Sequence, residues 1–207
     1  MNSKYILLSI SVLLVFLTIP LKAQEKDSKT SPIELKEHGK RFKDCRVLVK
    51  LNSNMRKLDI LRKNGQTKIA NRLAKDLDEE QNKIMKAFYE VFMIKDVYFF
   101  YSHESKDVLI DKNFGVLFNK EGQARTIKYT DKPTYVVTFE NPPFMPSVSD
   151  YWFGLFSLEL DGLKTLEYPF LNWVRTSSLL KRRNYSLGVK RLNKRISDTV
   201  FLSEKKI

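Results

Sequence analysis

Few side chains in this sequence have the chemistry of a nucleophile, a general base or a metal ligand. Its 207 residues include two histidines, His38 and His103, and one cysteine, Cys45. Metal sites usually combine several His, Cys or carboxylate ligands at fixed spacings, and the sequence contains neither an HExxH nor a CxxC motif. It also lacks GxSxG, P-loop and GxGxxG motifs. We therefore expect no metal and no cofactor, and most familiar hydrolase and nucleotide-binding activities lose support.

Cys45 and His103 form the first candidate for catalysis. A thiol becomes a nucleophile when a base or a positive charge lies beside it, and Lys43 and Arg46 lie near Cys45 in the sequence. The alternative is that Cys45 is a small apolar residue at the start of a strand, where free cysteines are common. Because the sequence has no second cysteine, no internal disulfide can form and the fold must rely on its core.

The second candidate is the polar segment SHES at residues 102–105, which follows a strongly apolar run. Loops at the ends of buried strands often hold binding residues, and Asp107 and Asp111 could join His103 there. An enzyme with an unrecognised site near His103 and these acids is therefore the alternative function. A capped turn whose polar side chains lie in water would explain the same residues.

The third candidate is a concentration of positive charge at the C-terminal end. From Arg175 onward the chain has ten Lys or Arg against two acids, a net charge of +8, whereas residues 24–174 are nearly balanced. Such a surface attracts anions, so we expect an anionic glycan, a lipid headgroup or an envelope protein as partner. A solvated surface that only keeps the protein soluble is the alternative. The candidate contacts are Lys181, Arg182, Arg183, Lys190, Arg191, Lys194 and Arg195.

The fourth candidate is a set of aromatic residues that could form a platform for carbohydrate. Its members are Trp152, Trp173, Phe144, Phe170 and Tyr168. Aromatic side chains in such numbers more often belong to the hydrophobic core, which is the alternative interpretation.

The elements that position these residues begin with a β-α-α-β unit. Residues 45–51 (CRVLVKL) alternate as a strand does, and residues 97–101 (VYFFY) are continuously apolar, which is typical of a strand buried on both faces. Between them, residues 55–63 and 67–93 carry apolar side chains at helical spacing, separated by Asn64 and Gly65. Such a crossover should place its two strands parallel.

The second half of the chain predicts strands joined by turns, followed by one closing helix. We expect strands at residues 115–118, 126–129, 135–139, 152–160 and 163–166, and irregular segments at 141–146 and 168–173. The helix over residues 185–197 carries apolar residues on one face and basic residues on the other. The predicted fold class is α+β: a mixed, largely antiparallel sheet opening with a β-α-α-β unit, helices packed on it, and a closing amphipathic basic helix.

Residues 1–23 resemble a cleavable secretory signal. Lys4 precedes an apolar run over residues 5–20, and Ala23 provides the small residue at which such signals are cut. A helix of that length reaches roughly 24 Å, short of the roughly 30 Å of a bilayer core. We expect residues 24–35 to be a flexible leader and residues 36–207 to form a single globular αβ domain with a basic C-terminal segment. The expected location is periplasmic or extracellular, with no transmembrane span after cleavage, which makes nucleic acid an improbable partner.

Three stretches carry a resemblance to a known family. They are residues 47–65 (VLVKLNSNMRKLDILRKNG), residues 84–102 with the phrase DVYFFYS, and residues 160–175 (LDGLKTLEYPFLNWVR). Their order and spacing resemble an uncharacterised family of small exported proteins from Gram-negative bacteria. That family has no assigned activity, so the resemblance implies no functional residue. The leading hypothesis is an exported cell-envelope protein that acts as a non-catalytic binding or structural module.

Overall fold

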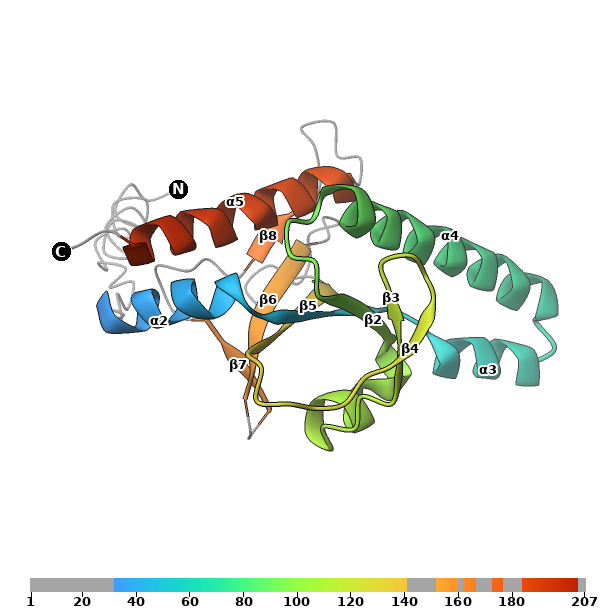
Figure 1. Cartoon of the computed structure of the whole chain (residues 1–207). Coiled ribbons are helices and arrows are strands. Elements are labelled where there is room, and N and C mark those ends of the chain that lie inside the picture. The colour runs from blue at the N-terminus through green and yellow to red at the C-terminus, as the bar shows by residue number, and fades with distance from the viewer. Residues whose placement is uncertain (1–31, 141–151, 160–161, 167–172, 177–183, 205–207) are drawn as a thin grey trace, which may run out of the picture.

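The computed structural model describes residues 32–140, 152–159, 162–166, 173–176 and 184–204 (Figure 1). Along the chain, the elements of its first half are α2 (Pro32–Lys43), β1 (Arg46–Leu51), α3 (Met55–Lys63), α4 (Thr67–Val91) and β2 (Val97–Tyr101). Short helical turns at Ser102–Glu104 (η1) and Lys106–Ile110 (η2) follow. The remaining elements are β3 (Val116–Asn119), β4 (Ala124–Thr126), β5 (Thr134–Glu140), β6 (Trp152–Glu159), β7 (Gly162–Thr165), β8 (Trp173–Arg175) and α5 (Tyr185–Glu204).

The strands form one sheet of eight, in the order β4-β3-β2-β1-β5-β6-β7, and β8 also pairs with β6. β1 lies at the centre and runs parallel to both β2 and β5. The other pairings are antiparallel. The predicted α+β class with a mixed, largely antiparallel sheet is therefore confirmed, and so is the β-α-α-β unit with its parallel strands.

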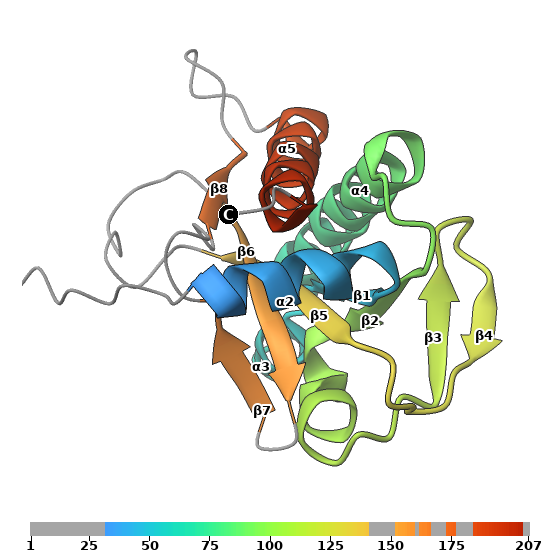
Figure 2. The same ribbon diagram turned by 60° about the vertical axis from the view of Figure 1, so that its left-hand side comes forward.

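Each face of the sheet packs against helical structure. Val47, Val49 and Leu51 of β1 belong to a large core that α2, α4 and α5 cover. Leu48, on the other face of β1, belongs to a second core, which η2 covers with Val108. Figures 1 and 2 show the three long helices together on one side of the sheet and the turns of residues 102–110 on the other.

Local boundaries differ from the predictions in several places. α2 begins at Pro32, so the last residues of the predicted flexible leader at 24–35 are helical, and α4 ends at Val91 instead of residue 93. The closing helix α5 extends to Glu204, beyond the predicted residue 197. β4 lies at Ala124–Thr126, so the segment predicted as a strand at 126–129 belongs mainly to the following connection. Trp173, expected in an irregular segment, begins β8, because its backbone pairs with Gly154 of β6. The predicted irregular segment at 141–146 and residues 168–172 lie outside the described residues.

Helices α3 and α4 form an arm that extends beyond the sheet (Figure 1). Leu58, Ala70 and Leu77 hold the two helices together in a small core of their own. Gly65, in the connection between them, has φ +70, a left-handed conformation that glycine adopts without steric cost. The arm is thus a helical hairpin attached to the domain mainly through the second half of α4, where Ile84 and Phe88 enter the large core.

Helices α2 and α5 come from opposite ends of the described chain and cross closely. A Cβ atom at Gly39 would lie 2.9 Å from the carbonyl oxygen of Thr199 and would also collide with the Ser203 side chain. Glycine at this position therefore permits a helix contact that no larger residue allows. Beside the crossing, the Lys43 ammonium group donates a hydrogen bond to Glu204 at 2.6 Å.

Among the helices that the structure describes, none combines the length and the apolar character that crossing a membrane requires. The predicted secretory signal at residues 1–23 is outside the described part of the chain.

Candidate functional site

The carboxyl ends of β1 and β2 lie side by side at one edge of the sheet. In the parallel register, Leu51 at the end of β1 pairs with Tyr101 at the end of β2. The segments that leave these strands, Asn52 to Asn54 and Ser102 to Glu104, therefore emerge next to each other. Open αβ sheets commonly place ligands at such an edge.

A hydrogen-bonded cluster of hydroxyl groups joins the two segments. The backbone N–H of Ser53 donates to the Ser102 Oγ at 3.0 Å, and the two serine hydroxyl oxygens are also 3.0 Å apart. The Nδ1 atom of His103 lies 3.0 Å from the Ser53 Oγ. Ser53 is only 8% exposed, whereas the His103 side chain lies at the surface. The predicted residues Ser102 and His103 thus meet a serine that sequence reasoning missed.

The acids beside His103 have other positions in the structure: Glu104 contacts the backbone at the end of β2, and neither Asp107 nor Asp111 lines the adjoining cleft. The Glu104 carboxylate accepts a hydrogen bond from the backbone N–H of Tyr101 at 2.7 Å, which closes the first helical turn after β2. Burial, together with the charges of Asp78 and Glu104, raises the pKa of Tyr101, whose ring stacks on that of His103. The described residues lining the adjoining cleft include neither Asp107 nor Asp111. Glu104 therefore supports the turn after β2, and neither aspartate lines the cleft beside His103.

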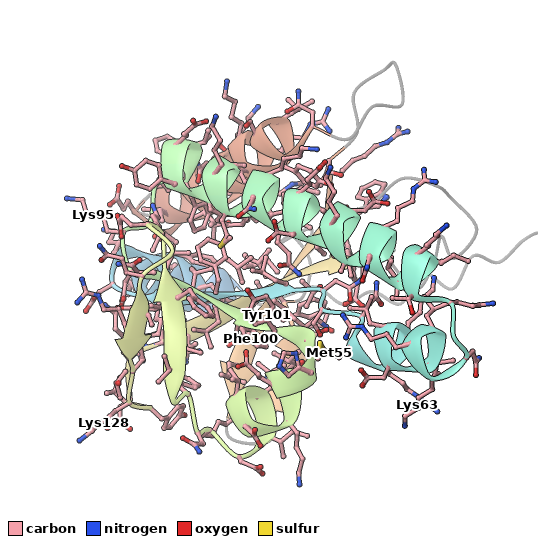
Figure 3. The ribbon with its side chains drawn as sticks, turned by 90° about the vertical axis from the view of Figure 1, so that its right-hand side faces the viewer. Met55, Lys63, Lys95, Phe100, Tyr101 and Lys128 are labelled. Carbon is pink, nitrogen blue, oxygen red and sulfur yellow. The ribbon has the colours of Figure 1, made fainter. Side chains whose placement is uncertain are left out.

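A cleft of about 580 Å³, which we call the α3 cleft, opens beside this cluster. Met55, Ile60 and Leu61 give it an apolar wall, and Arg56 and Lys57 bring positive charge. The other lining residues are Asn52, Ser53, Asn54, Ser102 and His103. Figure 3 shows Met55 at the end of α3 nearest to the strands and Lys63 at its far end. The arrangement suits a ligand that combines an anionic group with an apolar portion.

Asn54 sets the direction in which α3 leaves the strand. Its backbone has φ 45 and ψ 27, a left-handed conformation that asparagine tolerates better than most residues. The Asn54 N–H donates to the Asn52 side chain at 3.2 Å. No side chain caps the first turn of α3, so the N–H groups of that turn add partial positive charge beside Arg56 and Lys57.

A second cleft, of about 470 Å³, shares Asn52 and Asn54 with the α3 cleft but has the opposite charge. Its acidic residues come from α4 and include Asp76, Glu79 and Glu80. Glu80 accepts a hydrogen bond from the Tyr185 hydroxyl at 2.7 Å. The connection after β1 therefore separates a basic cleft from an acidic one, which favours anions on the α3 side.

The opposite edge of the sheet, where β1 and β2 begin, holds a closed network of charges. Lys132 bridges Asp44 at 2.9 Å and Asp96 at 3.0 Å, and the Arg46 Nε lies 3.7 Å from Asp96. The Arg46 guanidinium also lies over the rings of Tyr98 and Phe114, at 5.9 and 5.8 Å from their centroids. Arg46 is buried and Lys132 and Asp96 are partly buried, so these paired charges offer little to a ligand, whereas the Asp44 side chain is exposed.

The structure does not bring Cys45 and His103, the first candidate for catalysis, together. Cys45 precedes β1 and His103 follows β2, and because the strands are parallel the two residues lie at opposite edges of the sheet. A strand of five residues separates them by roughly 15 Å or more at about 3.3 Å per residue. Burial raises the pKa of the Cys45 thiol to about 12, and its Sγ lies 3.6 Å from the carbonyl oxygen of Phe42. Cys45 is therefore a core residue.

The basic face of the closing helix lies at the surface, as its amphipathic pattern predicted. Lys190, Arg191 and Lys194 are exposed and Arg195 is half-buried. The opposite face packs on the domain, with Tyr185, Val189, Leu192 and Ile196 buried. Arg191 donates a hydrogen bond to the carbonyl oxygen of Arg175 at 2.6 Å. The other predicted contacts, Lys181, Arg182 and Arg183, lie outside the described residues.

Two members of the proposed aromatic platform can be placed. The Trp173 ring packs edge-to-face on Phe156 at 5.6 Å, over a position where Gly154 leaves room for it. Trp152, on the next strand, is half-buried. These contacts fit a packing role within the sheet. Phe144, Tyr168 and Phe170 lie outside the part of the chain that the structure describes.

Within the described ranges, no three His, Cys, Asp or Glu side chains come together as a metal site would require. Comparisons with known proteins add no guidance, since no protein-family model, curated protein or solved structure matches this chain. The resemblance to a family of exported proteins therefore stays a prediction.

Proposed function

We propose that this protein is an exported, non-catalytic binding module that recognises an anionic ligand with an apolar portion in the α3 cleft. The observation that carries the proposal is the composition of this cleft. An apolar wall that includes Ile60 lies beside the charges of Arg56 and Lys57, and the hydroxyl and imidazole groups of Ser102 and His103 lie opposite. Ligand sites typically combine an apolar lining with a few polar groups that fix orientation.

The basic face of α5 supports the same preference for anions. Lys190 and Lys194 are exposed on this helix and form no ion pair with a described acid. Together with the net charge of +13, these residues favour long-range attraction of negatively charged partners such as envelope glycans.

Binding in the α3 cleft can be tested with an anionic aromatic probe, anilinonaphthalene sulfonate. We expect the probe to bind and to shift the amide NMR signals of residues 52–61 and of Ser102 and His103. Replacing Arg56 and Lys57 together by glutamine should weaken binding about 30-fold, since each partly desolvated charge contributes about 1 kcal/mol. The matched control replaces Lys190 and Lys194 by glutamine and removes the same charge elsewhere. Equal affinity in both double variants, or no binding, would overturn the proposed site.

Export is tested separately by mass spectrometry of the protein recovered from its native cell. We expect a chain that begins at Gln24 and is found outside the cytoplasm. A chain that retains Met1 to Ala23, or that fractionates with cytosolic proteins, would overturn this part of the proposal.

An enzyme is the second candidate function, because the Ser53 Oγ lies 3.0 Å from the His103 Nδ1. A serine hydroxyl that is hydrogen-bonded to an imidazole is the central pair of many acyl-transfer sites. Three features favour a structural role instead: Ser53 is 8% exposed, its hydroxyl also contacts Ser102, and Glu104 is bonded to the backbone of Tyr101. A fluorophosphonate probe decides between them. Labelling that disappears in Ser53→Ala would establish the enzyme, and absence of labelling would exclude this nucleophile.

A further inference from the structure

The α3–α4 arm carries a surface of positive charge that no acid among the described residues neutralises through an ion pair. Between residues 55 and 75 there are seven basic residues and one acid, Asp59. All seven are exposed, and none forms an ion pair with an acid in the described ranges. They are Arg56, Lys57, Arg62, Lys63, Lys68, Arg72 and Lys75.

Five of these basic residues, from Arg62 to Lys75, lie toward the outer end of the arm, while Arg56 and Lys57 line the α3 cleft. Every residue from 62 to 69 is exposed, so the end is accessible from all sides. Further along α4 the sign reverses, with Asp76, Asp78, Glu79 and Glu80. A partner with a long negative track, such as a nucleic acid, would meet these acids, whereas a flat anionic surface can meet the end of the arm alone.

An apolar residue is exposed among the basic ones. Ile69, in the first turn of α4, is 56% exposed. Lys68 precedes it and Arg72 follows it by three residues, which places Arg72 beside it on the helix surface. Cations that flank an exposed aliphatic side chain are the combination that membrane interfaces favour, because the charges meet headgroups while the apolar group enters the acyl boundary.

We propose that the end of the arm docks on the surface of an anionic phospholipid membrane. In this contact Lys63, Lys68 and Arg72 lie among the headgroups and Ile69 enters the interface. The proposal goes beyond ligand binding in the α3 cleft, since none of these four residues lines that cleft. It would give the module a defined orientation, with the arm toward the membrane.

The charge contribution is tested by vesicle co-sedimentation of the protein as recovered after export. The vesicles contain phosphatidylcholine with or without phosphatidylglycerol, and binding to the neutral vesicles is subtracted. Replacing Lys63, Lys68 and Arg72 by glutamine should weaken binding to the anionic vesicles about 100-fold, since each basic residue near such a surface contributes about fivefold.

The matched control replaces Lys190, Lys194 and Arg195 by glutamine, which removes the same charge from α5. We expect it to weaken vesicle binding by no more than about threefold. If both triple variants lose affinity equally, net charge alone drives binding and the arm is not the contact. That result, or no binding by the unchanged protein, overturns the proposal without affecting the probe experiment on the α3 cleft.

The apolar contribution separates a membrane from a soluble polyanion. Ile69→Asn should weaken vesicle binding about fivefold, because it removes a half-exposed aliphatic side chain from the interface. The same variant should bind heparin as tightly as the unchanged protein does. Equal losses for vesicles and heparin, or no loss for vesicles, would show that the arm binds anions generally and would overturn the membrane assignment.

Discussion

The two ends of the central parallel strands differ in what they do with polar groups. Where β1 and β2 begin, Arg46 is buried and Asp44, Asp96 and Lys132 complete a network of ion pairs. Where the same strands end, uncharged hydroxyls join the chains, two clefts open, and Arg56 and other cations lie exposed. One end is closed around its own charges, and the other leaves its charges available to a partner. The ion-pair network and the proposed binding cleft thus lie at opposite edges of one sheet.

The largest effect is expected at the closed end. Arg46→Ala should lower the free energy of unfolding by about 3 kcal/mol, because it removes a guanidinium whose side chain is 10% exposed, together with its contacts to Asp96 and two aromatic rings. The measurement is urea unfolding at neutral pH. The matched change at the open end, Arg56→Ala, should alter stability by no more than about 0.5 kcal/mol. Similar losses in the two variants would abolish the distinction between the edges.

A smaller effect is expected at high pH from Cys45, which lies at the closed end. Its pKa is raised from 9.0 to about 12 by burial, so the folded thiol stays protonated while the unfolded thiol ionises. The folded state then binds more protons, and its stability is complete below pH 9 and decreases as the pH rises toward 12. At pH 10.5 we expect this ionisation to have lowered the free energy of unfolding by about 2 kcal/mol.

Cys45→Ala isolates this contribution. The variant lacks the buried thiol, so its stability should decrease less steeply with pH. Parallel stability curves for the two proteins between pH 9 and 10.5, measured by urea unfolding, would show that the thiol is not protected by burial.

The smallest effect is expected at the open end, from the hydroxyl cluster. Ser53→Ala removes the contacts of its hydroxyl with Ser102 and His103 and should lower the free energy of unfolding by about 1 kcal/mol. The exposed serine Ser197 provides the control, since Ser197→Ala should change stability by less than about 0.5 kcal/mol. A loss in Ser53→Ala as large as that in Arg46→Ala would make this edge a structural element as well.

Local elements could be predicted from the sequence because their apolar spacing is local. The helix at Met55–Lys63 and the strand at Val97–Tyr101 have the predicted bounds, and the parallel pairing follows from the crossover between them. The position of β5 beside β1 could not be predicted, because strand order depends on contacts between segments far apart in the chain. β8 was missed for the same reason, since its three residues pair with a strand that ends fourteen residues earlier.

The site was predicted in part. Ser102 and His103 were found because they follow a buried strand, and the same argument applied to the other parallel strand would have found Ser53. The direction of the strands would also have separated Cys45 from His103. The basic arm was missed because charge was summed over residues 24–174, where the excess near Arg62 is partly offset by the acids after Lys75. The basic excess becomes visible only when the charges of each helix are counted separately.

The close crossing at Gly39 has a consequence for how the molecule is made. Helix α2, which contains Gly39, completes the large core only together with α5, which is the last described element of the chain. During synthesis, Phe42 and its neighbours therefore have no helix to pack against until nearly the whole polypeptide has emerged. The domain should therefore fold late and as a unit, and a newly made chain should stay incompletely folded until α5 has been synthesised.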